Sequence, residues 1–193
     1  MLTNTTPRWL PAGLLLGLLQ AWAPTALGQA NQFDPRSLAP FVPTPLEVVE
    51  RMLVLGGVKS SDTLYDLGSG DGRIVITAAQ MFGAKAVGVE LDADLAKRTQ
   101  ARIQELYIGD RAKVVEGDVM DVDLSEASVV TLYFLSASNM KLRPKLENNL
   151  KPGTRVVSHD FRIFGWTPVK TESFQHESRT HTIFVYRVGR NGP

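Results

Sequence analysis

Between residues 63 and 73 the chain reads TLYDLGSGDGR, an apolar segment that runs directly into three glycines at alternate positions. Glycine lets the backbone turn tightly and come within contact distance of a ligand, while the free N–H groups that open the next helix attract polar or negative groups. We therefore expect a strand at 63–67, a nucleotide-type binding turn and a helix at 72–82. An ordinary strand-to-helix turn without a ligand is the plainer alternative.

The glycine spacing and the acids around it indicate which kind of ligand binds. Dinucleotide-binding folds use G-x-G-x-x-G to approach a pyrophosphate, whereas Gly68, Gly70 and Gly72 form G-x-G-x-G. Asp66 stands two residues before the first glycine, and Asp71 lies between the last two. Carboxylates at those places would repel a pyrophosphate and suit an ammonium or a sulfonium. The turn therefore favours a cationic cofactor without phosphate.

The rest of the chain alternates strands with helices. Apolar β-branched runs and helical spacing of apolar residues predict further strands at 86–90, 113–116, 128–135, 154–159, 169–175 and 181–188, and helices at 45–55, 93–107 and 139–150. The first of these helices would have Pro45 at its first position and Thr44 as its cap. This order predicts an α/β fold with a mainly parallel seven-stranded sheet, helices on both faces and an antiparallel C-terminal strand pair.

Two further acids follow predicted strands. Glu90 ends the second strand, where a carboxylate can accept hydrogen bonds from ribose hydroxyls, as the ribose-binding acid of dinucleotide folds does. Asp118 follows the third strand, where it could accept from an adenine amino group while the Val119 N–H meets a ring nitrogen. The alternatives are a surface carboxylate at a strand end for Glu90 and a turn aspartate for Asp118.

Four segments resemble, in order and spacing, the successive motifs of class I S-adenosylmethionine methyltransferases. They are DLGSGDG at 66–72, GVELD at 88–92, GD at 117–118 and VTLYFL at 130–135. The resemblance implies a Rossmann-like class I methyltransferase fold with S-adenosyl-L-methionine as cofactor. The cofactor-binding residues it implies are Asp66, Gly68, Ser69, Gly70, Asp71, Gly72, Glu90, Asp118 and Val119.

The flanking segments narrow the resemblance. FVPTP at 41–45, LRPKL at 142–146 and WTP at 166–168 look like bacterial relatives of the mitochondrial protein-lysine methyltransferases that modify the ATP synthase and the adenine nucleotide carrier. This resemblance implies N-methylation of lysine in a protein substrate. Tyrosine is usual in those relatives where this chain has Phe41, so a role that needs a hydroxyl there does not carry over.

Methyl transfer from a sulfonium depends on positioning and on exclusion of solvent more than on a dedicated acid or base. Tyr133 and Phe134 leave the fourth strand, where aromatic walls could hold a lysine ammonium by cation–π contact, or both could be core residues. His159 and Asp160 end the fifth strand, where they could supply a general base or simply satisfy local hydrogen bonds. These four residues are the catalytic candidates.

Other segments carry weaker signals. His176 and His181 lie in the polar tail and are expected at the surface without metal spacing, so no metal site is predicted. The Pro-rich arm with Phe41, together with Trp166, could close over the cofactor as a lid or could cap the core.

Composition limits the partners. The chain has 193 residues, 21 Lys and Arg against 20 Asp and Glu, and no cysteine. One globular domain fits this length. The balanced charge argues against nucleic acid as the main partner, because phosphate binding shows as a basic excess. The lack of cysteine excludes disulfides, thiolate metal sites and cysteine nucleophiles.

The first residues have the pattern of an export signal. Arg8 precedes an apolar run, and small residues near Gly28 or Ala30 suit cleavage of a secretory signal peptide. We expect residues 1–28 to be a signal peptide or an N-terminal anchor, 29–45 to be an extended Pro-rich arm and 46–193 to be the methyltransferase domain. The protein would then be periplasmic, secreted or membrane-anchored and close to a membrane, or cytoplasmic if the leader is not functional.

Two other functions remain open at this point. A small-molecule methyltransferase would share the same cofactor motifs, because this fold serves many acceptors. An exported binding module that keeps the fold without catalysis would explain a leader that takes the protein away from cytoplasmic S-adenosylmethionine. An NAD-linked oxidoreductase is disfavoured by the glycine spacing.

Overall fold

The computed structural model describes Met1 and residues 34–189. Apart from Met1, the predicted leader lies outside the described residues, and so do positions 29–33 of the predicted arm. In the described part of the chain, no helix combines the length and the apolar character that a membrane span requires.

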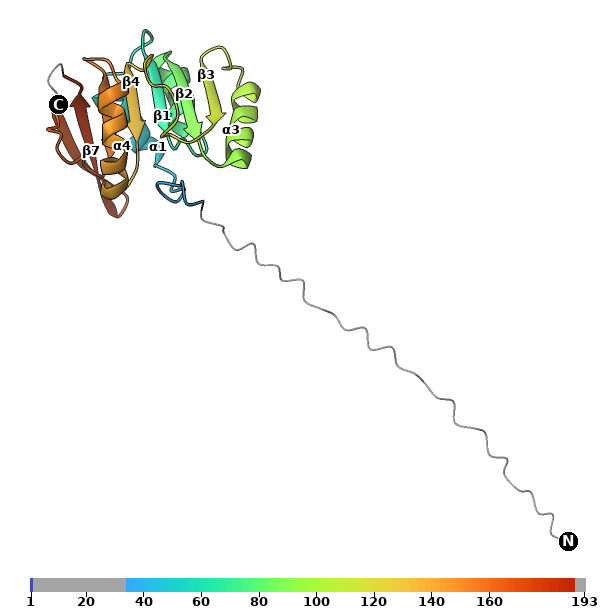
Figure 1. Ribbon diagram of the computed structural model, residues 1–193. Coiled ribbons are helices and arrows are strands. Elements are labelled where there is room, and N and C mark those ends of the chain that lie inside the picture. The colour runs from blue at the N-terminus through green and yellow to red at the C-terminus, as the bar shows by residue number, and fades with distance from the viewer. Residues whose placement is uncertain (2–33, 190–193) are drawn as a thin grey trace. The chain divides into compact units, whose positions relative to one another are not determined.

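Seven strands form one sheet, as predicted (Figure 1). They are β1 (Thr63–Leu67), β2 (Lys85–Glu90), β3 (Ala112–Glu116), β4 (Val129–Leu132), β5 (Arg155–His159), β6 (Lys170–His176) and β7 (Arg179–Arg187). Their order across the sheet is β3-β2-β1-β4-β5-β7-β6. The first five strands run parallel, and β7 lies antiparallel to both β5 and β6. The predicted α/β architecture with an antiparallel C-terminal pair is therefore confirmed.

Helices cover both faces of the sheet. They are α1 (Leu46–Leu55), α2 (Arg73–Phe82), α3 (Ala93–Glu105) and α4 (Ser136–Asn149). On one face α1, α2 and α3 contribute Val49, Val75 and Ile103 to a single buried cluster. On the other face, in front of the sheet in Figure 1, α4 contributes Leu142 and Leu146 to a second cluster. A sheet buried on both sides explains why its parallel strands read as continuous apolar runs.

Local chemistry corrects two boundaries. The predicted strand at 128–135 ends at Leu132, so Tyr133 and Phe134 lie in the connection to α4. Thr44 does not cap α1, because Pro45 takes the N-cap position and makes no side-chain cap. The Thr44 hydroxyl lies instead 3.5 Å from Nδ1 of His159.

The strand order places the ligand site. From β1 the chain proceeds outward to β2 and β3, and then returns to the other side of β1 with β4 and β5. Ligands of open α/β sheets bind beyond the carboxyl ends of the strands where the order reverses in this way. The carboxyl ends of β1 and β4 carry the glycine turn and Tyr133 respectively, so the predicted site residues converge on this edge.

Candidate active site

A cleft of about 820 Å³, partly open to solvent, lies at the carboxyl edge of the sheet. Arm residues 36–44 form one wall, and the glycine turn and the ends of β2 and β4 form the others. Nine of the residues singled out in the sequence line this cleft: Asp66, Gly68, Ser69, Asp71, Glu90, Asp118, Val119, Tyr133 and Phe134. The fold therefore brings together side chains that lie up to 68 positions apart in the chain.

Asp66 is the buried acid of the cleft. Only 3% of the residue is exposed, and its Oδ1 accepts a 2.7 Å hydrogen bond from the Thr131 hydroxyl of the neighbouring β4. Burial, together with the nearby acids Glu90 and Asp71, raises the pKa of the Asp66 carboxyl to about 7. A carboxyl in this state gains most from a cation, because a positive ligand stabilises the ionised form that burial disfavours.

Glu90 connects the end of β2 to the glycine turn. Its Oε2 accepts from the Gly70 N–H at 2.7 Å, and its Oε1 accepts from the Asp92 N–H at 3.0 Å. Each carboxylate oxygen has capacity for a further donor. Glu90 can therefore hold the turn and still accept hydrogen bonds from a ligand in the cleft.

The arm lies directly on the glycine turn. Gly70 has a φ of 55°, and a methyl group added to it would collide with the Phe41 ring. A methyl group at Gly72 would likewise collide with Thr99 of α3. Gly70 and Gly72 thus serve close packing on both sides of the turn and do not themselves line the cleft.

Asp71 has a different partner from the one expected. Its Oδ2 pairs with Nη2 of Arg73 at 2.6 Å, and this guanidinium lowers the pKa of the Asp71 carboxyl. Arg73 also donates to the Thr44 carbonyl oxygen at 2.6 Å. The charge of Asp71 is therefore balanced within the protein, and the pair anchors the arm to the turn.

Three other predicted residues complete the cleft. Oδ1 of Asp118 accepts from the Met120 N–H at 2.8 Å, which fixes the carboxylate beside Val119. The Phe134 ring packs where a side chain on Gly68 would stand. The Ser69 hydroxyl is buried without a hydrogen-bond partner among the described residues. An orphaned polar atom in a cleft wall fits a site that a polar ligand completes.

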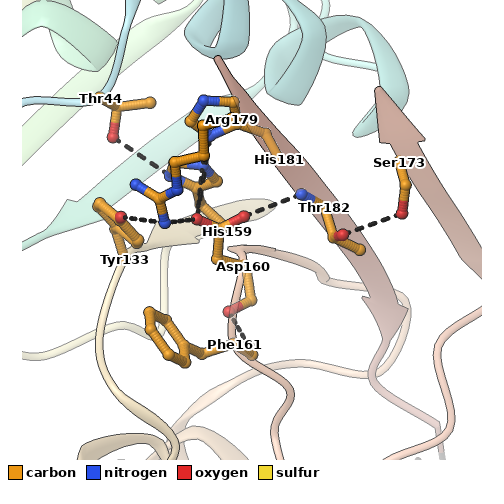
Figure 2. Close-up of polar contacts among 10 residues, drawn as sticks. Thr44, Tyr133, His159, Asp160, Phe161, Ser173, Arg179, His181 and Thr182 are labelled. Carbon is orange, nitrogen blue, oxygen red and sulfur yellow. Dashed lines mark hydrogen bonds and ion pairs between the residues drawn. The ribbon is translucent and has the colours of Figure 1, made fainter. Parts of the chain in front are cut away.

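A second group of polar residues lies behind Tyr133 (Figure 2). The Tyr133 ring stacks on His159 with 4.0 Å between ring centroids, and Nε2 of His159 lies 2.9 Å from Nδ1 of His181. Burial lowers the pKa of His159 to about 4, and burial also lowers that of His181. Both imidazoles are therefore neutral at pH 7, and one donates the shared hydrogen bond to the other.

The prediction that His181 lies at the surface is wrong, since only 2% of it is exposed. His181 belongs to β7, where it alternates with Ile183 and Val185 on the buried face. That alternation is visible in the sequence HTIFV at 181–185 and was the available signal. His176 is partly exposed and bonds to Glu47 through Nδ1 at 2.9 Å.

The same fold brings three potential metal ligands together where the sequence predicted none. One donor atom from each of His159, Asp160 and His181 lies within 4.8 Å of the others. Asp160, however, pairs with the Arg179 guanidinium. A cation is therefore already bound to the one acid of this group.

Trp166 does not take part in a lid. It is 6% exposed, packs edge-on to Tyr186 with ring centroids 5.7 Å apart, and donates its indole N–H to Glu147 at 2.9 Å. The physical reason is the apolar cluster under α4, which buries the indole and offers an acceptor for its N–H. Of the two aromatics considered, Phe41 lines the cleft and Trp166 closes the core.

Known proteins resemble this chain over most of its length. A family model for the ANTKMT methyltransferase domain matches residues 66–170. A protein-lysine N-methyltransferase of Saccharolobus islandicus (strain REY15A) is 47% identical over 153 residues, which are 79% of this chain and 95% of that protein. An ATP synthase lysine N-methyltransferase of Homo sapiens is 32% identical over 159 residues, 80% of this chain and 67% of that protein.

A solved structure agrees with the fold. The crystal structure of a protein from Salinibacter ruber, described as an RNA methyltransferase in complex with S-adenosyl-L-homocysteine, superposes with a TM-score of 0.73 at 47% identity. The superposition covers 79% of this chain and 97% of that one.

Replacing the buried acid should stabilise the protein without ligand. The native state keeps the Asp66 proton up to a pH of about 7, whereas the unfolded chain loses it near 4, so wild-type stability falls as pH rises between these values. We expect Asp66→Asn to raise the free energy of unfolding at pH 8 by about 1 kcal/mol or more, roughly 2–4 °C in Tm. The gain should shrink toward pH 5, as measured by thermal unfolding across this range.

Asp71→Asn is the matched control. Its carboxyl is ionised and paired with Arg73, so its replacement should bring no gain at any pH. Parallel stability curves for wild type and Asp66→Asn between pH 5 and pH 8 would mean that burial does not perturb Asp66.

Proposed function

The chain belongs to the ANTKMT methyltransferase domain family, and on that premise we propose that it transfers methyl groups from S-adenosylmethionine to lysine in a protein substrate. The observation that carries the proposal is the buried Asp66 at the glycine turn, beside Glu90 and without a protein cation of its own among the described contacts. That site suits a cationic cofactor.

The residues of the cleft fit S-adenosylmethionine. Glu90 would accept from the ribose hydroxyls, while Asp118 and the Val119 N–H would bind the adenine edge. Asp66 would balance the positive charge of the cofactor, and the Ser69 hydroxyl would gain a partner. When bound, the cofactor supplies a methyl group activated by its sulfonium. The protein contributes orientation and exclusion of water, to which the arm over the glycine turn is suited.

Protein lysine is the acceptor that the charge balance and the relatives support. The relatives from Saccharolobus islandicus and Homo sapiens are both named as lysine methyltransferases. The Salinibacter ruber protein is described as an RNA methyltransferase, so RNA is the competing acceptor. With 21 basic and 20 acidic side chains, this chain lacks the basic excess that usually accompanies RNA binding.

Removing the ribose-binding acid should weaken cofactor binding specifically. We expect Glu90→Ala to lower the affinity for S-adenosylhomocysteine by about 10–100-fold, because each hydrogen bond to a charged group contributes about 1.5–3 kcal/mol. Calorimetric titration measures this, with NAD as a ligand that should not bind. The matched control is Glu116→Ala, an exposed acid at the same register of the neighbouring strand, which should bind normally. Equal affinities for the two variants would refute the assigned role.

The acceptor can be identified by its product. Purified protein, S-adenosylmethionine with a labelled methyl group, and separate fractions of host protein, RNA and metabolites should give label in protein as methyl-lysine. Label that ribonuclease releases, or label confined to metabolites, would contradict the proposed acceptor. Cofactor binding without transfer to any fraction would favour the binding-module alternative.

We also propose that residues 1–28 direct export or anchor the chain at a membrane. The proposal is supported by Arg8, the apolar run after it and the small residues before Gly28. Protein recovered from its host should have the mass of a chain that begins at Gln29 or Asn31 if the leader is cleaved, or should sediment with membranes if it is an anchor. A full-length chain in the cytoplasmic fraction would contradict both.

A further inference from the structure

A second cavity adjoins the cofactor cleft on the far side of Tyr133. It holds about 580 Å³ of space, and Arg179 and His181 form part of its wall. Val42, Pro43 and Tyr133 line both this cavity and the cofactor cleft. A side chain that enters the second cavity would therefore approach the cofactor along this shared wall.

Asp160 is held rigidly beside this wall. Its φ of 58° lies in the left-handed region, which is unfavourable for a residue other than glycine. Two hydrogen bonds with Thr182 maintain it. The Asp160 N–H donates to the Thr182 carbonyl oxygen at 2.6 Å, and Oδ1 accepts from the Thr182 N–H at 2.8 Å. The carboxylate is thus fixed in direction, with Oδ2 left for a cation.

Arg179 supplies that cation at present. Its guanidinium donates to Oδ2 of Asp160 and, at 3.2 Å, to the Tyr133 hydroxyl (Figure 2). The Arg179 side chain is 53% exposed, whereas that of Asp160 is 11% exposed. Arg179 lines the second cavity and Asp160 does not, so the guanidinium separates the carboxylate from the cavity.

The surroundings leave the charge of Asp160 to a movable group. The adjacent imidazoles of His159 and His181 are neutral, because burial lowers the pKa of both. Nε2 of His159 lies 3.4 Å from Oδ2 of Asp160. The cation paired with Asp160 therefore comes from a long, half-exposed side chain that can turn into solvent at small cost.

We propose that Asp160 and Tyr133 form the subsite for the ammonium group of the acceptor lysine, and that Arg179 occupies this subsite until the acceptor displaces it. The proposal rests on the proposed function, since it assumes a lysine acceptor. Exchange of one cation for another never leaves the largely buried carboxylate unpaired, which would be strongly unfavourable. Val42 and Pro43 offer apolar contact to the lysine stem. The ammonium would then lie at the boundary between the two cavities.

The test compares two peptides on the full chain saturated with S-adenosylhomocysteine. One is an acetylated and amidated peptide with a single lysine among glycines, and the other has norleucine in its place. The ratio of their dissociation constants, measured by calorimetry, isolates the ammonium. We expect the wild type to prefer lysine and Asp160→Asn to reduce this preference about tenfold or more, the usual effect of losing a hydrogen bond to a charged group.

Two arginine variants complete the test. Arg179→Ala empties the subsite, so the preference for lysine should increase several-fold. Arg51→Ala is the matched control, because Arg51 is 52% exposed and pairs with Glu172 on the outside of α1, and it should leave the preference unchanged. Asparagine tolerates the left-handed backbone and keeps an acceptor for the Thr182 N–H, so Asp160→Asn should fold and bind S-adenosylhomocysteine normally.

The outcomes separate the subsite from the proposed activity. Equal binding of the two peptides to the wild type, or an Arg179→Ala variant that loses lysine preference as Asp160→Asn does, would overturn the subsite. If Asp160→Asn does not fold, Arg179→Ala decides alone by the direction of its change. A lysine preference that responds as expected, in a protein that methylates no polypeptide, would refute the proposed activity while supporting the subsite.

Discussion

A carboxyl group buried at the carboxyl end of a central strand is unfavourable in its ionised form unless a cation reaches it, and the site is arranged around this constraint. Asp66 ends up there because β1 lies between β2 and β4, with Thr131 of β4 as its hydrogen-bond donor. The glycine turn that follows lets the backbone leave the sheet without covering the acid. Glu90 then fixes the turn through the Gly70 N–H. The cofactor of this family carries the positive charge that the arrangement lacks.

The parts of the site that could be predicted are those in which local sequence dictates geometry. The strand at 63–67 has the predicted bounds, and the turn after it needs glycine at Gly70 because of both its backbone angle and its packing. Glu90 could be placed because the end of a strand adjacent to the turn has few alternatives. Periodicity and turn chemistry were sufficient for these elements.

The parts that could not be predicted depend on pairings between distant segments. Asp71 was expected to face the cofactor, but Arg73, two residues away, takes its charge in order to hold the arm. His181 becomes buried only because β7 enters the sheet between β5 and β6. The same strand brings Arg179 onto Asp160, 19 positions earlier. No local pattern specifies these contacts, since the antiparallel register of β7 creates them.

Asp66 and Asp160 place an acid on either side of Tyr133, one toward the cofactor and one toward the proposed acceptor, which matters because both reactants are cations before transfer. The first of these acids is central, and the protons it exchanges give the most direct test. S-adenosylmethionine titrated into the protein at pH 6 in buffers of different ionisation enthalpy should release about one proton per site, with none released by pH 9, because the bound cation lowers the pKa of Asp66. Asp66→Asn should abolish the release. Binding without proton release at pH 6, or an undiminished release from the asparagine variant, would contradict the account.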